Sequence, residues 1–148
     1  MEFMPTILLL EDDVERIHRF ASTAALLAPP HEVRVWADAF TMMEEVREFV
    51  VTASLISLDH DLETLPGSRD PGDGLLIARF LASQPIVRPV IVHSSNAERA
   101  RMMMGEFELA GWPQERVLPI GVDWIERDWR RAVERLIFDD LRGQSTSA

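Results

Sequence analysis

Short apolar runs alternate with amphipathic stretches along the chain. Mainly apolar segments bounded by turn-forming residues predict five β-strands: Pro5–Leu10, His31–Ala37, Ser54–Leu58, Arg88–His93 and Arg116–Ile120. Between and after them, apolar residues recur at helical spacing, which predicts helices over about 13–27, 38–50, 73–83, 95–110 and 123–141. Good N-cap residues stand near their starts: Asp13, Asp38, Ser95 or Asn96, and Asp123. This alternation is typical of βαβ units with a parallel sheet.

The order of these elements predicts a single α/β domain of the doubly wound, flavodoxin-like kind. Right-handed crossovers favour a five-stranded parallel sheet of order 2-1-3-4-5 with helices on both faces. A six-stranded dinucleotide-binding fold is disfavoured because the chain has 148 residues and no G-x-G-x-x-G turn. We expect the domain to span residues 1–142 and residues 143–148 (GQSTSA) to form a disordered tail.

The net charge of −10 limits the partners of this chain. Such a surface repels phosphate backbones and anionic lipids, so neither nucleic acid nor a membrane is expected as a partner. All fifteen basic residues are arginine and there is no cysteine, so no function here uses a lysine or a thiolate. A small anionic ligand would need a metal ion, an arginine or a helix N-terminus. No basic residue precedes the first apolar run, so a secretory signal is not indicated and a cytoplasmic location is expected.

Polar residues stand at the ends of three predicted strands. Glu11-Asp12-Asp13 follows the first strand, Asp59-His60-Asp61 follows the third, and His93-Ser94-Ser95-Asn96 closes the fourth. In such sheets, ligands bind outside the carboxyl ends of the strands, where the strand order reverses, here between strands 1 and 3. We therefore expect the three segments to converge on one crevice.

Several carboxylates in one crevice repel one another. Two unit charges about 4 Å apart repel by roughly 4 kcal/mol at an effective dielectric constant of about 20. Protonation of some acids, or a cation among them, relieves the repulsion. Oxygen ligands suit Mg²⁺, or Mn²⁺ if a histidine joins, so we predict such a site with four ligands: Glu11, Asp12, Asp13 and Asp59. The alternative is that these acids are helix caps and solvated loop ends, with Asp13 the clearest cap.

Two histidines stand beside these acids. Aspartates flank His60 and would stabilise its imidazolium, which suits a general acid or a phosphate donor. We predict His60, His93 and Asp59 as catalytic residues. A structural hydrogen bond for His60 and a satisfied position at the core edge for His93 remain as alternatives.

Further polar residues of the three segments, and the loop after the third strand, complete the predicted site. The predicted ligand-binding residues are Ser94, Asn96, Asp61 and Asp73, although Ser95 and Asn96 also suit helix caps. The loop from about His60 to Gly72 is long enough to act as a lid over the crevice.

These residues resemble the receiver domain of bacterial response regulators. Leu8–Asp13, followed by Arg16, is similar to that family's first strand and acidic pair. Asp59 stands where receivers keep the phosphorylated aspartate, and Asp73-Gly74 and Pro89–Ser94 are similar to the start of the third helix and to the fourth strand. The resemblance covers about residues 5–141. It departs at Leu118-Pro119, where receivers have a lysine that contacts the phosphoryl group.

Other segments resemble a divergent family, the cyclic-phosphate processing receiver domains. They are Glu11-Asp12-Asp13, Ser57–Leu62, Gly72-Asp73-Gly74 and His93-Ser94-Ser95-Asn96. The resemblance implies a small phosphate-containing ligand, such as a cyclic nucleotide, bound with a divalent metal. One histidine would then activate water and the other would protonate the leaving oxygen.

Two further interpretations stay open. The chain could be a single-domain phosphoacceptor, with Asp59 taking a phosphoryl group and a helix face signalling to a protein partner. It could also be a pseudo-receiver that binds partners without chemistry. The missing lysine weighs against the first of these and the two additional histidines weigh against the second.

Overall fold

Five parallel strands form one sheet in the predicted order, β2-β1-β3-β4-β5. The structure is a computed structural model and describes residues 4–145. The strands are β1 (Thr6–Leu10), β2 (Glu32–Trp36), β3 (Ala53–Leu58), β4 (Val90–Val92) and β5 (Gln114–Arg116). Both the fold class and the strand order predicted from the sequence are therefore confirmed.

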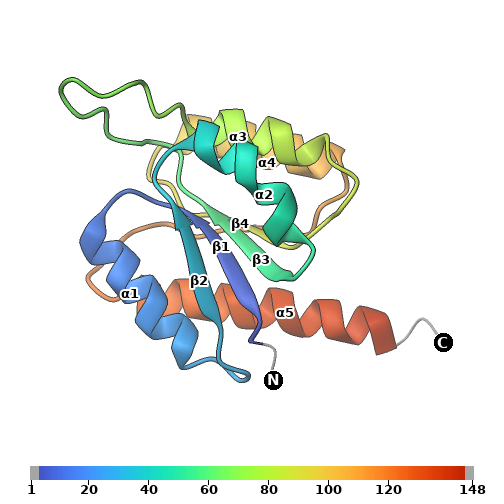
Figure 1. Cartoon of the computed structure of the whole chain (residues 1–148). Coiled ribbons are helices and arrows are strands. Elements are labelled where there is room, and N and C mark those ends of the chain that lie inside the picture. Colours follow the sequence, from blue (N-terminus) through green and yellow to red (C-terminus); the bar gives the residue numbers. More distant parts are fainter. Residues whose placement is uncertain (1–3, 146–148) are drawn as a thin grey trace.

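Helices cover both faces of the sheet (Figure 1). They are α1 (Val14–Ala25), α2 (Ala39–Val50), α3 (Gly74–Ala82), α4 (Ala97–Leu109) and α5 (Arg130–Ser145), the last preceded by a π-helical turn, η1 (Ile125–Trp129). Figure 1 shows α1 and α5 on one side and α2, α3 and α4 on the other. None of the helices within residues 4–145 is long and apolar enough to cross a membrane.

The continuous apolar run of β1 follows from its position between these two helical layers. Ile7 and Leu9 pack with the core beneath α1 and α5, whereas Leu8 and Leu10 pack with the core beneath α2, α3 and α4. All four side chains are fully buried. Alternate residues of a strand point to opposite faces, so a strand covered on both faces is apolar at every position.

Short polar side chains begin four of the helices. Each accepts a hydrogen bond from the backbone N–H three residues later: Asp13 at α1, Asp38 at α2, Asp73 at α3 and Asn96 at α4. This satisfies a donor that the first helical turn leaves free, and it agrees with the predicted starts of these helices.

The fifth strand lies earlier in the chain than predicted. The sequence pattern predicts it over Arg116–Ile120, but the strand is Gln114–Arg116. After Val117, whose N–H donates to Val92 O, the chain leaves the sheet. Pro119 has no N–H to donate, and Leu118 and Ile120 are exposed, so the apolar run there is not a core strand.

The last helix also differs from its predicted bounds. The predicted helix begins after Asp123, and the structure has the π-helical turn first, with the N–H of Trp129 donating to Trp124 O. Helix α5 continues to Ser145, past the predicted end near Leu141. Gly143 costs a helix about 1 kcal/mol but does not stop it. Three residues of the predicted tail are thus helical, and residues 146–148 lie outside the described residues.

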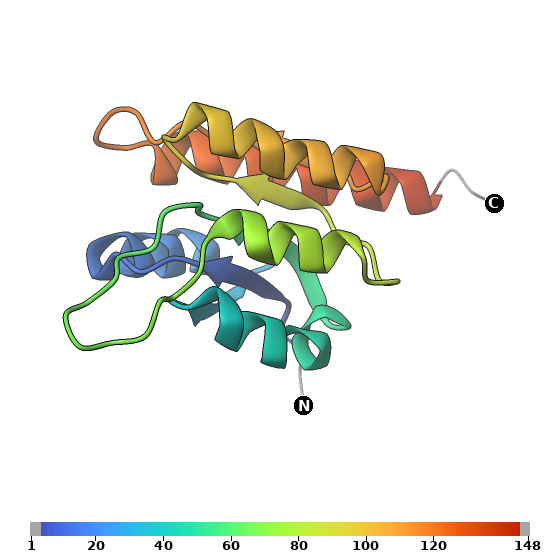
Figure 2. The ribbon, with the colours of Figure 1, turned by 90° about the horizontal axis from the view of Figure 1, so that it is seen from above.

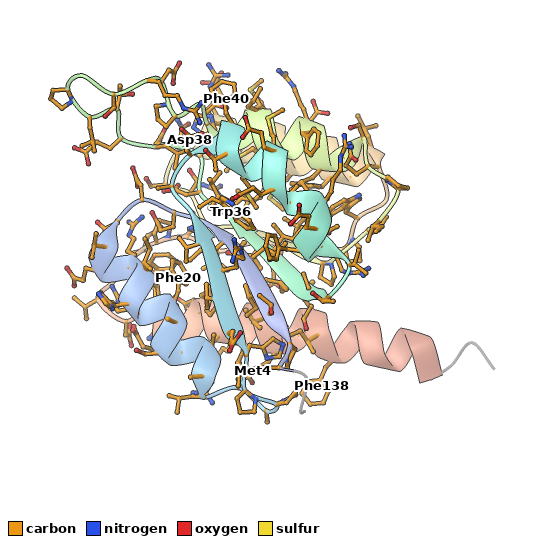
Figure 3. All side chains as sticks on the ribbon, in the orientation of Figure 1. Met4, Phe20, Trp36, Asp38, Phe40 and Phe138 are labelled. Carbon is orange, nitrogen blue, oxygen red and sulfur yellow. The ribbon has the colours of Figure 1, made fainter. Side chains whose placement is uncertain are left out.

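The segment between β3 and α3 projects beyond the rest of the domain in both Figure 1 and Figure 2. The Glu63 N–H donates to Asp12 Oδ2 at one end of the segment. Arg69 contacts Asp38 near the other end, with Nε 3.3 Å from Oδ2. Asp38 and Phe40 are labelled in Figure 3 at the start of α2, beside this segment.

Candidate functional site

Three chemically active side chains meet at the carboxyl edge of the sheet, one from each of the strands β1, β3 and β4. Glu11, Asp59 and His93 directly follow these strands, and their backbone N–H groups extend the sheet by donating to Trp36 O, Leu10 O and Leu58 O. One ligand atom of each lies within 4.8 Å of the others. All three residues are buried, Glu11 and His93 completely.

Two atoms of this cluster lack hydrogen-bond partners within the described part of the chain. They are Glu11 Oε1 and His93 Nε2, which lie 3.3 Å apart without an aligned hydrogen bond. Glu11 Oε2 accepts the N–H of Asp12 at 3.1 Å. Buried polar atoms normally have partners, so these two atoms are exceptions that require an explanation.

Arg16 brings positive charge to the cluster from the first turn of α1. Its Nη1 lies 3.6 Å from Glu11 Oε1 and 3.9 Å from Asp59 Oδ2. The guanidinium also lies over the Trp124 ring, 5.3 Å from its centroid. These distances exceed those of hydrogen bonds, so Arg16 lies near both carboxylates while its donors remain available to a ligand.

Burial and neighbouring charges shift the pKa values of the Glu11 and Asp59 carboxyl groups in opposite directions. Burial, together with the charge of Glu11, raises the pKa of Asp59 to about 6, although His93, Arg16 and the His60 N–H favour its ionised form. Burial also opposes ionisation of Glu11, but contacts with His93 and Arg16 outweigh it and lower the pKa of Glu11. Near neutral pH the cluster thus holds two buried carboxylates that a cation would stabilise.

A solvent-open pocket of about 390 Å³ leads to the two carboxylates. Its lining combines residues of the segments predicted to converge there, Ser95 among them, with three that the sequence prediction did not assign to the site: Arg16, Leu62 and Glu63. The predicted residues in the lining are Glu11, Asp12, Asp13, Asp59 and Asp61. The sequence did offer a signal for Arg16, since it lies one helical turn after the acidic segment.

The predicted metal ligands divide into two groups. Glu11 and Asp59 lie together, and their oxygen atoms suit Mg²⁺ or Mn²⁺. Asp12 is half-buried and accepts the Glu63 N–H, while Asp13 is exposed and caps α1. The fit to a divalent cation therefore rests on Glu11 and Asp59, with Asp12 at the pocket wall.

His60 and His93 face different helical layers. His60 is buried beside the start of α3, with Nδ1 2.9 Å from Asp61 Oδ1 and Nε2 3.6 Å from Asp73 Oδ2. His93 packs against Phe20 of α1 at a ring-centroid distance of 5.0 Å, and neither histidine lines the pocket. The sequence prediction has one histidine activate water and the other protonate the leaving oxygen of one ligand, whereas the two imidazoles here face different helical layers.

The start of α3 packs tightly on the end of β3. A Cβ atom placed on Gly74 would lie 2.2 Å from Asp59 O and 2.8 Å from His60 Cα. The Gly74 N–H donates to His60 O at 2.9 Å. Glycine is therefore needed at this position, and the contact holds Asp59 and His60 in place.

The remaining predicted ligand residues have structural partners. Ser94 is buried and its hydroxyl accepts the Asn96 N–H at 3.1 Å, while Asn96 caps α4. Asp73 caps α3, and Asp61 both contacts His60 and lines the pocket. Of the two serines, the exposed Ser95 faces the pocket and Ser94 does not.

A buried pair of hydrogen bonds lies behind His93. Ser57 Oγ lies 2.7 Å from His93 Nδ1, and the Trp129 indole N–H donates to the same oxygen at 3.0 Å. Ser57 lies in β3, His93 directly follows β4, and Trp129 ends the π-helical turn before α5. The sequence pattern does not assign Ser57 or Trp129 to the site, because nothing local to either residue indicates this contact.

Comparison with protein families gives one match that covers most of the domain. Residues 7–108 match the family model of the cyclic-phosphate processing receiver domain. This range includes Glu11, Asp59 and His93. No curated protein matches the chain in sequence.

Solved structures with similar folds are response-regulator receiver domains. The response regulator domain of Thermotoga maritima CheB has a TM-score of 0.66 at 14% identity, covering 92% of this chain and 98% of its own. The phosphorylated cyanobacterial phytochrome response regulator RcpA has a TM-score of 0.60 at 19% identity, covering 99% and 98%. CheY from Borrelia burgdorferi, solved with CheX, BeF3 and Mg²⁺, has a TM-score of 0.60 at 13% identity, covering 86% of each chain.

Proposed function

Because this chain belongs to the family of cyclic-phosphate processing receiver domains, we propose that it binds a cyclic phosphate, such as a cyclic nucleotide, with the help of a divalent cation. The observation that carries the proposal is the buried cluster of Glu11, Asp59 and His93 at the base of an open pocket. Two of its polar atoms lack aligned hydrogen bonds to the described residues, which supports a ligand at this cluster.

Glu11 and Asp59 are the residues that would hold the cation. Their carboxylates are buried side by side, and burial raises the pKa of Asp59 to about 6, so a cation beside Asp59 would stabilise its ionised form. A bound Mg²⁺ or Mn²⁺ would neutralise phosphate oxygens and favour attack at phosphorus. The similar receiver CheY was solved with Mg²⁺, which supports this choice of metal.

Arg16 is the residue of this chain that suits the phosphate. It is the basic residue of the pocket lining, and its guanidinium is partly exposed above the two carboxylates. An arginine can donate two parallel hydrogen bonds to phosphate oxygens. This donor matters more here than in most chains, since the sequence contains no lysine.

Hydrolysis would open the phosphate ring. A water oxygen bonds to phosphorus, one P–O ester bond breaks, and the proton released from water ends on the leaving oxygen, which gives a phosphate monoester. The charge that accumulates on the phosphate oxygens lies beside Arg16 and the cation-binding carboxylates. His60 contacts Asp61 and Asp73 instead of the pocket, so the proposal assigns it to holding the β3–α3 segment.

The test is a panel of cyclic nucleotides and other cyclic phosphates with Mg²⁺ or Mn²⁺. Calorimetry measures binding, and ³¹P NMR detects the monoester. We expect binding by the wild type and its loss in Asp59→Asn, while Asp128→Asn, which alters a half-buried carboxylate on the π-helical turn, behaves as wild type. Absence of binding across the panel would refute the proposal, and binding without monoester would limit the function to sensing.

A phosphoacceptor function is the second candidate. Asp59 stands at the end of β3 beside Glu11, and its Oδ2 lies 3.9 Å from Arg16, where a phosphoryl group could attach. The similar solved structures are response-regulator receivers, one of them phosphorylated. The absence of lysine weighs against a working phospho-switch. A signalling protein partner and a cytoplasmic location stay predictions in either case.

A further inference from the structure

The Ser57 hydroxyl and the Trp129 indole occupy one side of His93, and the cation-binding carboxylates occupy the other. We infer that Ser57 and Trp129 are positioning residues that keep the His93 proton on Nε2, so that His93 supports Glu11 as a hydrogen-bond donor and does not ligate the metal. This inference deepens the proposed function and rests on it for its chemical meaning. The arrangement of protons can nevertheless be measured without any ligand.

The direction of these hydrogen bonds follows from the groups involved. The Trp129 indole N–H can only donate, so the contact of 3.0 Å with Ser57 Oγ uses a lone pair of that oxygen. The Ser57 hydroxyl has one proton of its own. The 2.7 Å contact gives that proton an acceptor, His93 Nδ1, provided that Nδ1 carries no hydrogen.

The opposite tautomer leaves a buried donor without an acceptor. If Nδ1 carried the proton, both the indole and the imidazole would donate to Ser57 Oγ. Among the described residues, no second acceptor for the Ser57 hydroxyl is observed, and Ser57 is completely buried. An unsatisfied hydroxyl in the interior is costly, so the hydrogen bonds select the proton on Nε2.

The other ring nitrogen faces Glu11. His93 Nε2 lies 3.3 Å from Glu11 Oε1, a distance that a small rotation of either side chain converts into a hydrogen bond. His93 is also the first of the neighbours that lower the pKa of Glu11. The hydrogen bonds therefore run from Trp129 to Ser57 and from Ser57 to His93, which leaves the Nε2 proton of His93 beside the carboxylate that would hold the cation.

Aromatic side chains of the helical layer formed by α1 and α5 hold this arrangement in place. Phe20 of α1 packs on the imidazole at a centroid distance of 5.0 Å, and the Trp124 ring lies 6.1 Å away. Trp129 ends the π-helical turn and is fully buried. Such turns occur frequently at functional sites, where they change the direction of a side chain.

The first experiment reads the tautomer directly. Long-range ¹H–¹⁵N NMR of the metal-free protein, with ¹⁵N-labelled histidine at a pH near 8, distinguishes the nitrogen that carries the proton. His31 is a built-in reference of the opposite kind, because its Nδ1 lies 2.8 Å from Pro29 O, a carbonyl that can only accept. We expect a proton on Nε2 for His93 and on Nδ1 for His31. A proton on Nδ1 of His93, or on both of its nitrogens, would overturn the inference.

The second experiment removes the positioning group. In Ser57→Ala the Nδ1 resonance of His93 should move to the position of a nitrogen without a hydrogen bond. The affinity for Zn²⁺ relative to Mg²⁺ should rise by at least about tenfold, because His93 becomes free to turn a lone pair towards the metal. The control is Ser54→Ala, which removes the hydroxyl 3.1 Å from His31 Nε2 and should leave His93 unchanged.

The outcomes separate the two proposals. If the wild type shows the expected tautomer but binds no cation or cyclic phosphate, the proposed function fails and the proton arrangement stands. If binding occurs but Ser57→Ala changes neither the His93 resonance nor the preference for Zn²⁺, the positioning role is refuted and the proposed function stands.

Discussion

Glu11 Oε1 and His93 Nε2 lie 3.3 Å apart at the ends of two strands, and both residues are completely excluded from solvent. Neither atom has an aligned hydrogen bond to any described residue. A carboxylate and an imidazole in such a position cost stability while no ligand is present. A pocket open to solvent is lined by Glu11 beside this place.

A divalent cation should stabilise the folded protein. Binding to the folded state alone raises the melting temperature with concentration, so Mg²⁺ or Mn²⁺ should increase it. Asp59→Asn should lose most of this response and Asp12→Asn part of it. Differential scanning fluorimetry with Asp128→Asn as the control measures the effect. An unchanged wild-type melting curve at saturating metal would exclude the site.

Asp59→Asn should stabilise the metal-free protein at pH 7.5. The pKa of Asp59 is raised from 3.8 to about 6, so ionising this carboxyl in the folded state has a cost that is complete above about pH 6 and absent below 3.8. We expect a gain of about 1–3 kcal/mol in the free energy of unfolding at pH 7.5.

The pH dependence of that gain is the control. As the pH falls from 7.5 to 4, wild-type Asp59 takes up its proton and the difference between the two proteins should shrink. Urea denaturation at several pH values measures it. A variant that is less stable than wild type at pH 7.5 would show that the Asp59 charge is well compensated in the folded protein.

The protein should not act as a phospho-switch. Receivers use a lysine to hold the phosphoryl group, and this chain has none. Incubation with a small phosphodonor and Mg²⁺, followed by intact-mass measurement, should show no substantial gain of one phosphoryl group. A gain that disappears in Asp59→Asn would contradict this and favour the phosphoacceptor function.

The two histidines should differ in their effect on the site. His93→Phe keeps an aromatic ring against Phe20 but removes the imidazole that would donate to Glu11. The Mg²⁺ affinity should therefore fall about 10–100-fold, and any turnover of a cyclic phosphate should fall with it. His60→Ala should change the Mg²⁺ affinity much less, because His60 faces α3 and not the carboxylates of Glu11 and Asp59. Calorimetric titration with Mg²⁺ measures both affinities. Equal losses of affinity in the two variants would show that both histidines support cation binding.

Gly74 and Gly105 should respond in opposite ways to alanine. A Cβ at Gly74 would lie 2.2 Å from Asp59 O, so Gly74→Ala must displace α3 or the end of β3 and destabilise the protein. Gly105 lies within α4 with nothing within 4 Å of such a Cβ, so Gly105→Ala should stabilise by about 0.5–1 kcal/mol. Thermal denaturation compares them, and a neutral Gly74→Ala would show that the start of α3 can move.

The sequence by itself determined the order of elements and the sheet. Apolar runs such as that of β1 predict buried strands because a strand covered on both faces is apolar at every position. Right-handed crossovers then leave few possible orders of the strands in the sheet. The same topology brings Glu11, Asp59 and His93 to one edge, since residues that follow parallel neighbouring strands must lie together. The predicted bounds of β5 were wrong because an apolar loop containing Pro119 has the composition of a strand.

Only the tertiary structure decided which groups the side chains of the site residues contact. His60 and His93 both follow strands of the sheet, but helices from distant parts of the chain determine their partners, α3 for one and α1 with the π-helical turn for the other. Ser57 meets His93 across 36 residues and Trp129 across 72. No local pattern carries such contacts, because they depend on how two helical layers pack on one sheet, and that packing selects which nitrogen of His93 faces the carboxylates.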